Sequence, residues 1–205
     1  IRPPHDAVAC TQHALDEIEL MLEHEVPPEL VAAMIVEPVL GEGGYVPAPA
    51  AFLKELRAIC DRIGALLIMD EIQTAFGRAG AWTVADRHGV RPDILTLAKA
   101  LGGGLPLGAV AASRELHAKW QTGTHGSTFG GNPVSCASGL ATLRVIQEER
   151  LIERAEKVGG IIEEELRPIA RNERVREIRR IGAMVAVEFD DKARSKSAIG
   201  GALER

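Results

Sequence analysis

The sequence has little cysteine, no excess of positive charge and no long apolar run. Its three cysteines, Cys10, Cys60 and Cys136, are odd in number and lack the spacing of a metal site, so we expect free thiols in a reducing compartment and no metal centre. The formal net charge of −5 and the absence of a basic stripe argue against nucleic acid as a partner. No run approaches the about 20 apolar residues of a membrane-spanning helix, and no signal peptide opens the chain, which leaves the cytoplasm as the default location.

The remaining composition is that of a globular protein. Of the 205 residues, 46% are hydrophobic and 26% are charged, which is enough for one sizeable domain or a large part of a bigger one. The chain opens at Ile1 without an initiator Met, and residues 200–205 look like the first turn of a helix. A helix that short is marginal without continuation, so we expect an internal piece of a longer protein.

Short apolar runs alternate with stretches of helical periodicity. The runs expected to form buried strands are residues 31–38, 65–70, 93–99 and 108–113. Helices are expected at residues 14–25, with Leu15, Ile18, Met21 and Leu22 on one face, at residues 50–64, ending at Gly64, and at residues 132–170. The alternation predicts an α/β fold with a mostly parallel, doubly wound sheet.

A break after about Glu149 suggests two units. Residues 1–149 would form part of a large domain, and residues 150–205 would be the start of a smaller α+β domain. Two apolar stretches near the end, 175–182 and 184–189, are expected to pair as strands.

Charged residues stand where the expected strands end. Glu37 and Asp70 directly follow two of the apolar runs, and Lys99 closes a third. Ligands of parallel sheets bind beyond the carboxyl ends of the strands, so an acid and an amine would share one rim. Burying the Asp70 carboxylate costs several kcal/mol unless a cation pairs with it. The segment around Asp70 supplies no Lys or Arg that would by itself account for such a pairing.

Lys99 and Asp70 are more informative about function as a pair than either residue is alone. A desolvated lysine beside a glycine-rich turn can act as a Schiff-base nucleophile, although its stem could equally cover apolar surface. An aspartate alone is more often an N-cap or an ion-pair partner. A cofactor that bonds to a lysine and needs an acid on its ring nitrogen is pyridoxal phosphate, and the cation for Asp70 would be the protonated pyridine.

Four segments, residues 35–44, 66–80, 92–109 and 125–133, resemble successive signature blocks of the class III aminotransferases, which have the pyridoxal-phosphate fold type I. The resemblance runs from about Val31 to Glu188. Asp70, Lys99 and Thr128 also follow one another at equal intervals of 29 residues (99 − 70 and 128 − 99), in agreement with the family.

The resemblance implies a role for each matched residue. Lys99 would hold the cofactor and move the proton between the substrate carbon and the cofactor. Asp70 would pair with the pyridinium, Ile72 would pack on one face of the ring, and Gln73 would hydrogen-bond the phenolic oxygen. Thr128 would donate its hydroxyl to the phosphate of the neighbouring subunit's cofactor, which implies a homodimer with shared sites.

Glu42 would pair with an arginine near the C-terminus of the full-length family proteins and regulate how substrate carboxylates enter. Simpler roles stay open for four of these residues. Thr128 could cap the helix expected near Asn132, and Gln73 could stitch a turn. Ile72 could fill the core, and Glu42 could be solvated in its glycine-rich loop.

The sequence also departs from the family pattern. Leu40 and Ala79 stand where the family often has Gln and Thr. The small-residue loop that cups the phosphate, the aromatic side chain that stacks on the ring and the C-terminal substrate-binding Arg of the family have no counterpart here.

The resemblance favours transfer of an amino group from an ω-amino acid such as 4-aminobutyrate to a 2-oxo acid such as 2-oxoglutarate. Ornithine or acetylornithine transamination, or an aminomutase or racemase on the same scaffold, stays open. A non-catalytic chain that folds with a partner is a second class of hypothesis. A dinucleotide-binding domain is disfavoured because no G-x-G-x-x-G follows a strand in the required context.

Overall fold

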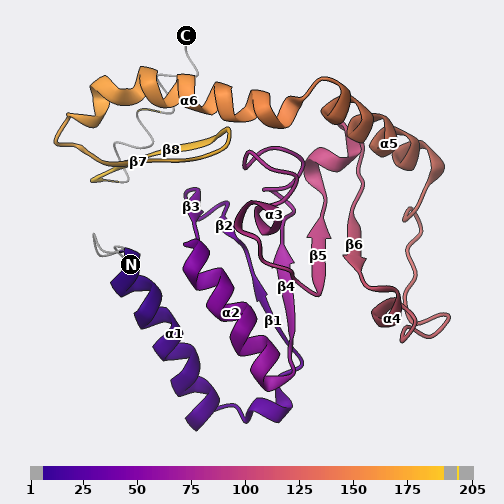
Figure 1. The fold of residues 1–205 in the computed structure, drawn as a ribbon. Helices are drawn as coiled ribbons and strands as arrows, with labels where there is room; N and C mark the ends of the chain where they lie inside the picture. Colours follow the sequence, from indigo (N-terminus) through magenta and orange to yellow (C-terminus); the bar gives the residue numbers. More distant parts are fainter. Residues whose placement is uncertain (1–6, 192–197, 199–205) are drawn as a thin grey trace.

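The computed structural model describes residues 7–191 and residue 198, so the helical turn expected at residues 200–205 lies outside the described residues. Its centre is a four-stranded sheet in the order β1-β4-β5-β6 (Figure 1). The strands are β1 (Ala33–Val36), β4 (Leu66–Asp70), β5 (Ile94–Leu97) and β6 (Ala109–Ala112). Two antiparallel pairs accompany the sheet: β2 (Val39–Leu40) with β3 (Val46–Pro47), and β7 (Val175–Ile181) with β8 (Met184–Phe189).

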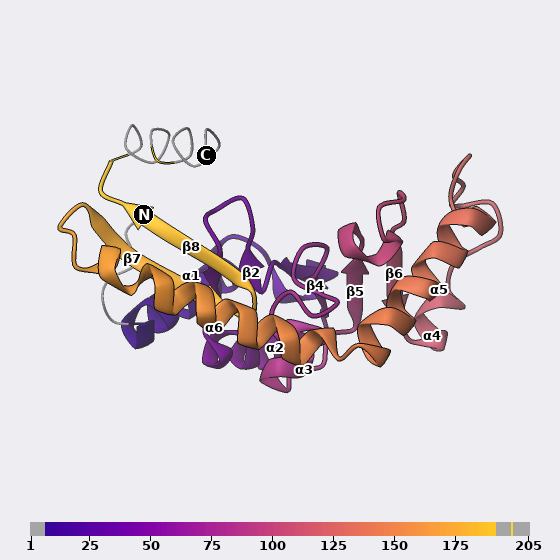
Figure 2. The ribbon, with the colours of Figure 1, turned by 90° about the horizontal axis from the view of Figure 1, so that it is seen from above.

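The helices run mainly over one side of this sheet, and the last two cross its end and the β7–β8 pair (Figure 2). They are α1 (Ala7–His24), α2 (Ala50–Ile63), α3 (Val84–His88), α4 (Arg114–His117), α5 (Pro133–Glu148) and α6 (Leu151–Ala170), with short 3-10 turns η1 (Pro28–Leu30) and η2 (Lys99–Gly102). Among the described residues, none of these helices is long and apolar enough to cross a membrane.

The mixed α/β fold with a mainly parallel sheet is confirmed. β1 pairs with β4 and β4 with β5 in parallel, whereas the edge strand β6 is antiparallel to β5. The connection from β5 to β6, residues 98–108, contains only a short 3-10 turn and is shorter than the roughly twelve residues that a parallel crossover needs. The strand pair expected near the end is also confirmed as β7 and β8.

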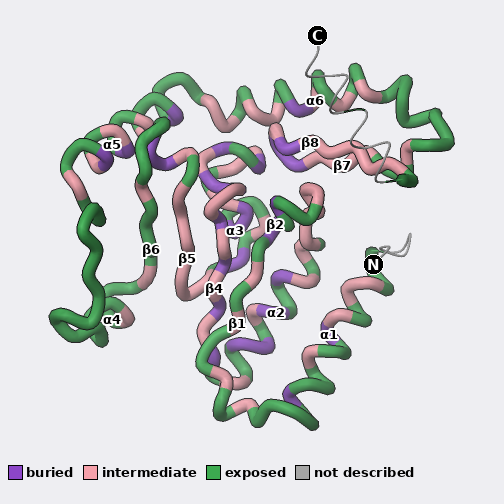
Figure 3. Tube along the Cα trace, turned by 180° about the vertical axis from the view of Figure 1, so that it is seen from behind, coloured by how far each residue is buried: buried purple, intermediate pink, exposed green. Residues whose placement is uncertain are grey.

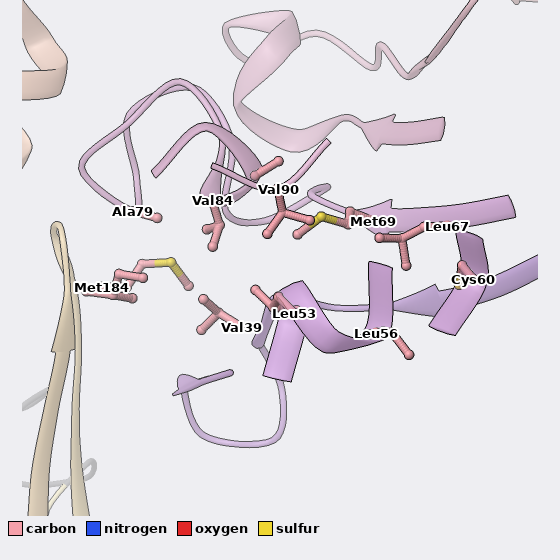
Figure 4. Packing of buried hydrophobic residues seen from close by; sticks show 12 residues of the cluster. Val39, Leu53, Leu56, Cys60, Leu67, Met69, Ala79, Val84, Val90 and Met184 are labelled. Carbon is pink, nitrogen blue, oxygen red and sulfur yellow. The ribbon is translucent and has the colours of Figure 1, made fainter. Parts of the chain in front are cut away.

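One face of the sheet packs against α2 (Figure 4). Leu67 and Met69 of β4 are 1% and 0% exposed and contribute to a core with Leu53 and Leu56 of α2. The helix ends as expected, because Gly64 adopts the left-handed conformation (φ 74°) and donates its N–H to the Cys60 carbonyl.

The opposite face of the sheet is largely open in this chain (Figure 3). The expectation of a fully buried strand at residues 31–38 is wrong, since β1 alternates between exposed and half-buried residues and Ile35 is 66% exposed. A strand is buried on both faces only when something packs on each, and here α2 covers one. Similarly, α1 starts at Ala7 rather than near Ala14, and Met21, expected on the same face as Leu15 and Leu22, is 49% exposed.

The β4–β5 pairing is tied together where both strands begin. Asp93, just before β5, donates its N–H to the Leu67 carbonyl (2.9 Å), while its Oδ2 accepts from Leu67 N (2.8 Å) and from Arg57 Nη1 of α2 (2.6 Å). These hydrogen bonds and the adjacent guanidinium lower the pKa of the Asp93 carboxyl below its ordinary value, against the opposing effect of burial. One side chain therefore links two strands and the helix that covers them.

The β7–β8 turn is packed tightly between α6 and the loop after β4. Gly182 in this turn has φ +59°, and a Cβ on it would lie 2.3 Å from Gly80 N. A Cβ on Gly159 of α6 would lie 1.8 Å from the Gly182 carbonyl oxygen. Ala183, which follows Gly182 in the turn, donates its N–H to the Arg78 carbonyl (2.9 Å). Three backbones meet here with no room for a side chain.

This contact predicts opposite effects for two neighbouring glycines of α6. Gly159→Ala should lower the free energy of unfolding by about 2–3 kcal/mol, because the methyl group would overlap the Gly182 backbone. Gly160→Ala should raise it by up to about 1 kcal/mol, because a Cβ there meets nothing within 4 Å and alanine favours the helix. Urea denaturation of both variants provides the test, and equal effects would contradict the tight contact.

Candidate active site

The polar residues predicted to share one rim do so. β1, β4 and β5 are parallel, so their carboxyl ends point to the same edge of the sheet (Figure 1). Glu37 follows β1, Asp70 is the last residue of β4, and Lys99 comes two residues after the end of β5. An acid and an amine far apart in sequence therefore stand at the ends of neighbouring strands.

Asp70 lies on the open face of the sheet, opposite to the face that α2 covers. Its neighbour across the pairing is Thr96 of β5, so both side chains are on the same face. Asp70 is partly exposed, and its Oδ1 accepts from Ile72 N at 3.1 Å. The Thr96 hydroxyl is buried and has no hydrogen-bond partner within the described part of the chain. A partly satisfied acid and an unsatisfied hydroxyl thus lie side by side.

Lys99 begins the turn η2 with a strained backbone. Its φ of +44° lies in the left-handed region, which costs a residue with a Cβ about 1–2 kcal/mol. The rest of the turn is held in place by α5. Leu101 and Gly102 are buried, and Ser138 of α5 donates its hydroxyl to the Gly102 carbonyl (2.8 Å). Lys99 itself is exposed in this chain.

Ile72 and Gln73 lie in a series of turns that follows β4. Both are partly exposed, whereas Glu71 before them is fully buried, so Ile72 and Glu71 do differ in the side to which they are directed. Gln73 lies against the loop between β2 and β3. A Cβ built on Gly41 of that loop would be only 1.6 Å from Gln73 Oε1.

Glu42, next to Gly41, is exposed. Its loop is held by other residues: Gly41 N donates to Glu37 Oε2 (3.0 Å), and Arg179 Nη2 of β7 donates to the Gly44 carbonyl (2.9 Å). Arg179 is the arginine at this loop, but its guanidinium pairs with Glu177 and Glu188. Within residues 7–191, the Glu42 loop is therefore joined to the β7–β8 pair through Arg179 and the Gly44 carbonyl, and not through the Glu42 carboxylate.

Thr128 is exposed and lies in the segment between α4 and α5, which runs along the far side of the edge strand β6 (Figures 1 and 3). β5 and β6 separate this segment from β4, so the chain does not bring Thr128 to Asp70 in the way it brings Lys99. The alternative role of Thr128 as a helix cap is wrong, because Asn132 caps α5 by accepting from Ser135 N (2.9 Å).

Glu71 is the residue of this site that sequence reasoning missed. It is 0% exposed, and burial raises the pKa of its carboxyl although three hydrogen bonds oppose that effect. A signal was present, because successive residues of a strand point to opposite faces. If Asp70 faces the open side, Glu71 must face the core and find buried donors there.

These features define a class of protein: an α/β domain that offers a lysine and an aspartate at neighbouring strand ends, as enzymes that carry pyridoxal phosphate do. Residues 4–205 match the aminotransferase class III family. The chain belongs to this family, whose enzymes depend on pyridoxal phosphate.

Similar proteins agree with the assignment. The chain is 48% identical over 162 residues to the acetylornithine aminotransferase of Methanosarcina acetivorans, covering 78% of this chain and 40% of that protein. It is 40% identical over 187 residues to a 5-aminovalerate aminotransferase of Pseudomonas aeruginosa (88% and 44%). A solved amine transaminase from an uncultivated Pseudomonas species, in a form with bound pyridoxal phosphate, superposes with a TM-score of 0.85 at 38% identity (94% and 46%). The chain spans about two fifths of the length of the curated relatives.

The residues at the rim fit this cofactor. Lys99 offers an exposed amine for its aldehyde, and Asp70 offers a carboxylate with capacity left for a protonated ring nitrogen. The buried Thr96 hydroxyl beside Asp70 has no hydrogen-bond partner among the described residues and lies on the same face.

The contact between Gly41 and Gln73 gives a prediction for the site. Gly41→Ala should lower the free energy of unfolding by about 1–3 kcal/mol, because the new methyl group would displace the Gln73 amide. In a Gln73→Ala background the same change should cost far less. A double-mutant cycle by thermal unfolding measures the coupling, and additive effects would show that the two residues do not meet.

Proposed function

We propose that this protein is a pyridoxal-phosphate-dependent aminotransferase that moves an amino group from an ω-amino acid to a 2-oxo acid such as 2-oxoglutarate. The observation that carries the proposal is the position of Asp70 and Lys99 at the carboxyl ends of the neighbouring parallel strands β4 and β5. Membership of the class III family supports it independently.

Four residues of this chain would hold the cofactor. Lys99 Nζ would bond to it, Asp70 would keep the ring nitrogen protonated, Gln73 would donate to the phenolic oxygen, and Ile72 would pack on the ring. The bound cofactor supplies an electron sink for negative charge at the substrate carbon. Lys99 would then carry the proton to and from that carbon, for which its exposed place at the rim is suitable.

Thr128 would act in a homodimer. We propose that its hydroxyl donates to the cofactor phosphate of a second subunit, because its own chain keeps it beyond β6. The surroundings support an interface between copies: Phe129 is 81% exposed and Trp120 is 58% exposed, and Val134 of α5 is 68% exposed. These exposed apolar side chains follow one segment from the end of α4 to the start of α5, and we infer that a second copy covers this segment.

Glu42 would regulate the entry of substrate carboxylates from its exposed loop.

Residues 1–149 would belong to the large domain, and residues 150–205 would be the start of a smaller C-terminal domain. The break between α5 and α6 at residues 149–150 is compatible with that division. The three cysteines are all free thiols, as a reducing cytoplasm would keep them.

The donor would carry its reacting amine on a terminal carbon. 4-Aminobutyrate is the donor expected from the signature blocks, and the similar proteins named for 5-aminovalerate and acetylornithine extend the choice to longer chains. In each of these donors the reacting amine lies on a terminal carbon, several bonds from the carboxylate.

Lys99 is predicted to be the attachment point of the cofactor. Borohydride reduction of the whole protein with pyridoxal phosphate, followed by peptide mass mapping, should give one pyridoxyl adduct, on the Lys99 peptide. Lys99→Ala should abolish it, whereas Lys54→Ala, which removes an exposed lysine of α2, should not. An adduct spread over many lysines, or none, would contradict the proposal.

A panel of amino donors tests the predicted donor class. With 2-oxoglutarate as acceptor, the whole protein should form glutamate from 4-aminobutyrate, 5-aminovalerate or acetylornithine at least about tenfold faster than from α-amino acids that lack a second amine, a discrimination of about 1.4 kcal/mol or more. Activity confined to such α-amino acids would exclude the ω-donor assignment. Racemisation without transfer would favour the racemase alternative.

A further inference from the structure

The turn that carries Ile72 and Gln73 is anchored by the buried carboxylate of Glu71. Glu71 Oε2 accepts from the Thr74 hydroxyl at 2.6 Å and from Val84 N at 2.8 Å, and Oε1 accepts from Ala85 N at 2.8 Å. Val84 and Ala85 are the first residues of α3. One side chain thus joins the end of β4, the turn after it and the start of a helix more than ten residues away in sequence.

The main chain of the same residue is also engaged. Glu71 N donates to the Thr96 carbonyl of β5 (3.0 Å), and the Glu71 carbonyl accepts from Ala75 N (3.1 Å). Thr96 is the cross-strand neighbour of Asp70. Glu71 therefore fixes the place where Asp70 leaves the sheet as well as both ends of the turn that contains Gln73.

No described lysine or arginine forms an ion pair with Glu71; its donors are two backbone N–H groups and a hydroxyl. This makes it an expensive anchor, since a buried carboxylate costs several kcal/mol unless its hydrogen bonds are complete. A simple helix cap does not need that cost, because α3 already has one: Thr83 Oγ1 accepts from Asp86 N at 2.9 Å.

We propose that Glu71 is a positioning residue, which holds Asp70 and Gln73 in the arrangement that receives the ring of the cofactor. Asp70 and Glu71 are then a pair with separate tasks on opposite faces of the strand: one meets the ligand and the other holds the backbone. The part of this inference that concerns the ligand rests on the proposed function; the part that concerns the turn does not.

The test compares Glu71→Gln with Thr83→Ala, which removes the ordinary cap of α3 and leaves the turn untouched. The amide that Glu71→Gln introduces would face at least one backbone N–H with a donor of its own. In the cofactor-free whole protein, hydrogen exchange at residues 72–75 and at Val84 and Ala85 should be about tenfold faster in the Glu71→Gln variant. Thr83→Ala should speed exchange at Asp86 and leave residues 72–75 unchanged.

Thr74→Val provides a second variant in case Glu71→Gln fails to fold. It keeps the carboxylate and removes one of its three donors, so it should speed exchange at residues 72–75 by a smaller factor. If neither variant changes exchange in the turn relative to Thr83→Ala, Glu71 is a helix cap only and the proposal is overturned.

Cofactor binding separates this inference from the proposed function. Titration of pyridoxal phosphate, followed by near-ultraviolet circular dichroism, should give a Kd about tenfold weaker in Glu71→Gln and an altered dichroic band, with neither change in Thr83→Ala. Faster exchange with an unchanged Kd and band would overturn the role toward the cofactor. A wild-type protein that binds no pyridoxal phosphate would refute the proposed function and with it that role, while the exchange data would still decide whether Glu71 holds the turn.

Discussion

The parallel pairing of β4 with β5 is the constraint on which the site depends. Asp93 bonds through both its N–H and its carboxylate to Leu67 at the start of the pair, and Glu71 N bonds to the Thr96 carbonyl at its end. With both ends tied, the register between the strands cannot slip. A shift by one residue would turn Asp70 toward α2 and the core, because side chains alternate between the faces of a strand.

The rim is also tied to the last strands of the described chain. Gln73 leaves room for nothing larger than glycine at position 41, and Arg179 of β7 holds the carbonyl of Gly44 in the same loop. On the other side, the Gly182 turn reaches the loop at Gly80, and Met184 contributes to the core that contains Leu67 and Met69 (Figure 4). The loops that carry Gly41 and Gln73 therefore lie in contact with both the sheet and the β7–β8 pair.

Much of the fold followed from local patterns. The apolar run before Asp70 is β4, the periodicity before Gly64 is α2, and the rim residues stand where parallel strands end. What failed depended on neighbours rather than on local sequence. Ile35 looks like a core residue but is exposed because only one face of β1 is covered. The direction of β6 could have been inferred, since the connection before it is too short for a crossover.

The site was predicted less completely than the fold. The lysine and the aspartate carry distinctive chemistry, and their spacing agreed with a family, so they could be singled out. Glu71 has the same chemistry as Asp70, and only the alternation of the strand distinguishes a carboxylate that meets a ligand from one that holds a turn. The exposure of Lys99 could not be read from an apolar strand, because it depends on what surrounds the rim.

Three of the four strained non-glycine residues of the described chain lie within a few residues of the proposed site residues. Among the described residues, Tyr45, Phe76, Lys99 and Arg150 are the non-glycine residues with positive φ. The first lies in the Glu42 loop, the second in the turn after Gln73, and the third is the proposed attachment point. Each such residue costs about 1–3 kcal/mol and persists only where surrounding contacts hold it. At Lys99 those contacts are the buried η2 turn and the Ser138 hydrogen bond. A glycine would relieve the strain but would lack the amine, so the strained conformation at Lys99 is consistent with the role that the proposed function gives its side chain.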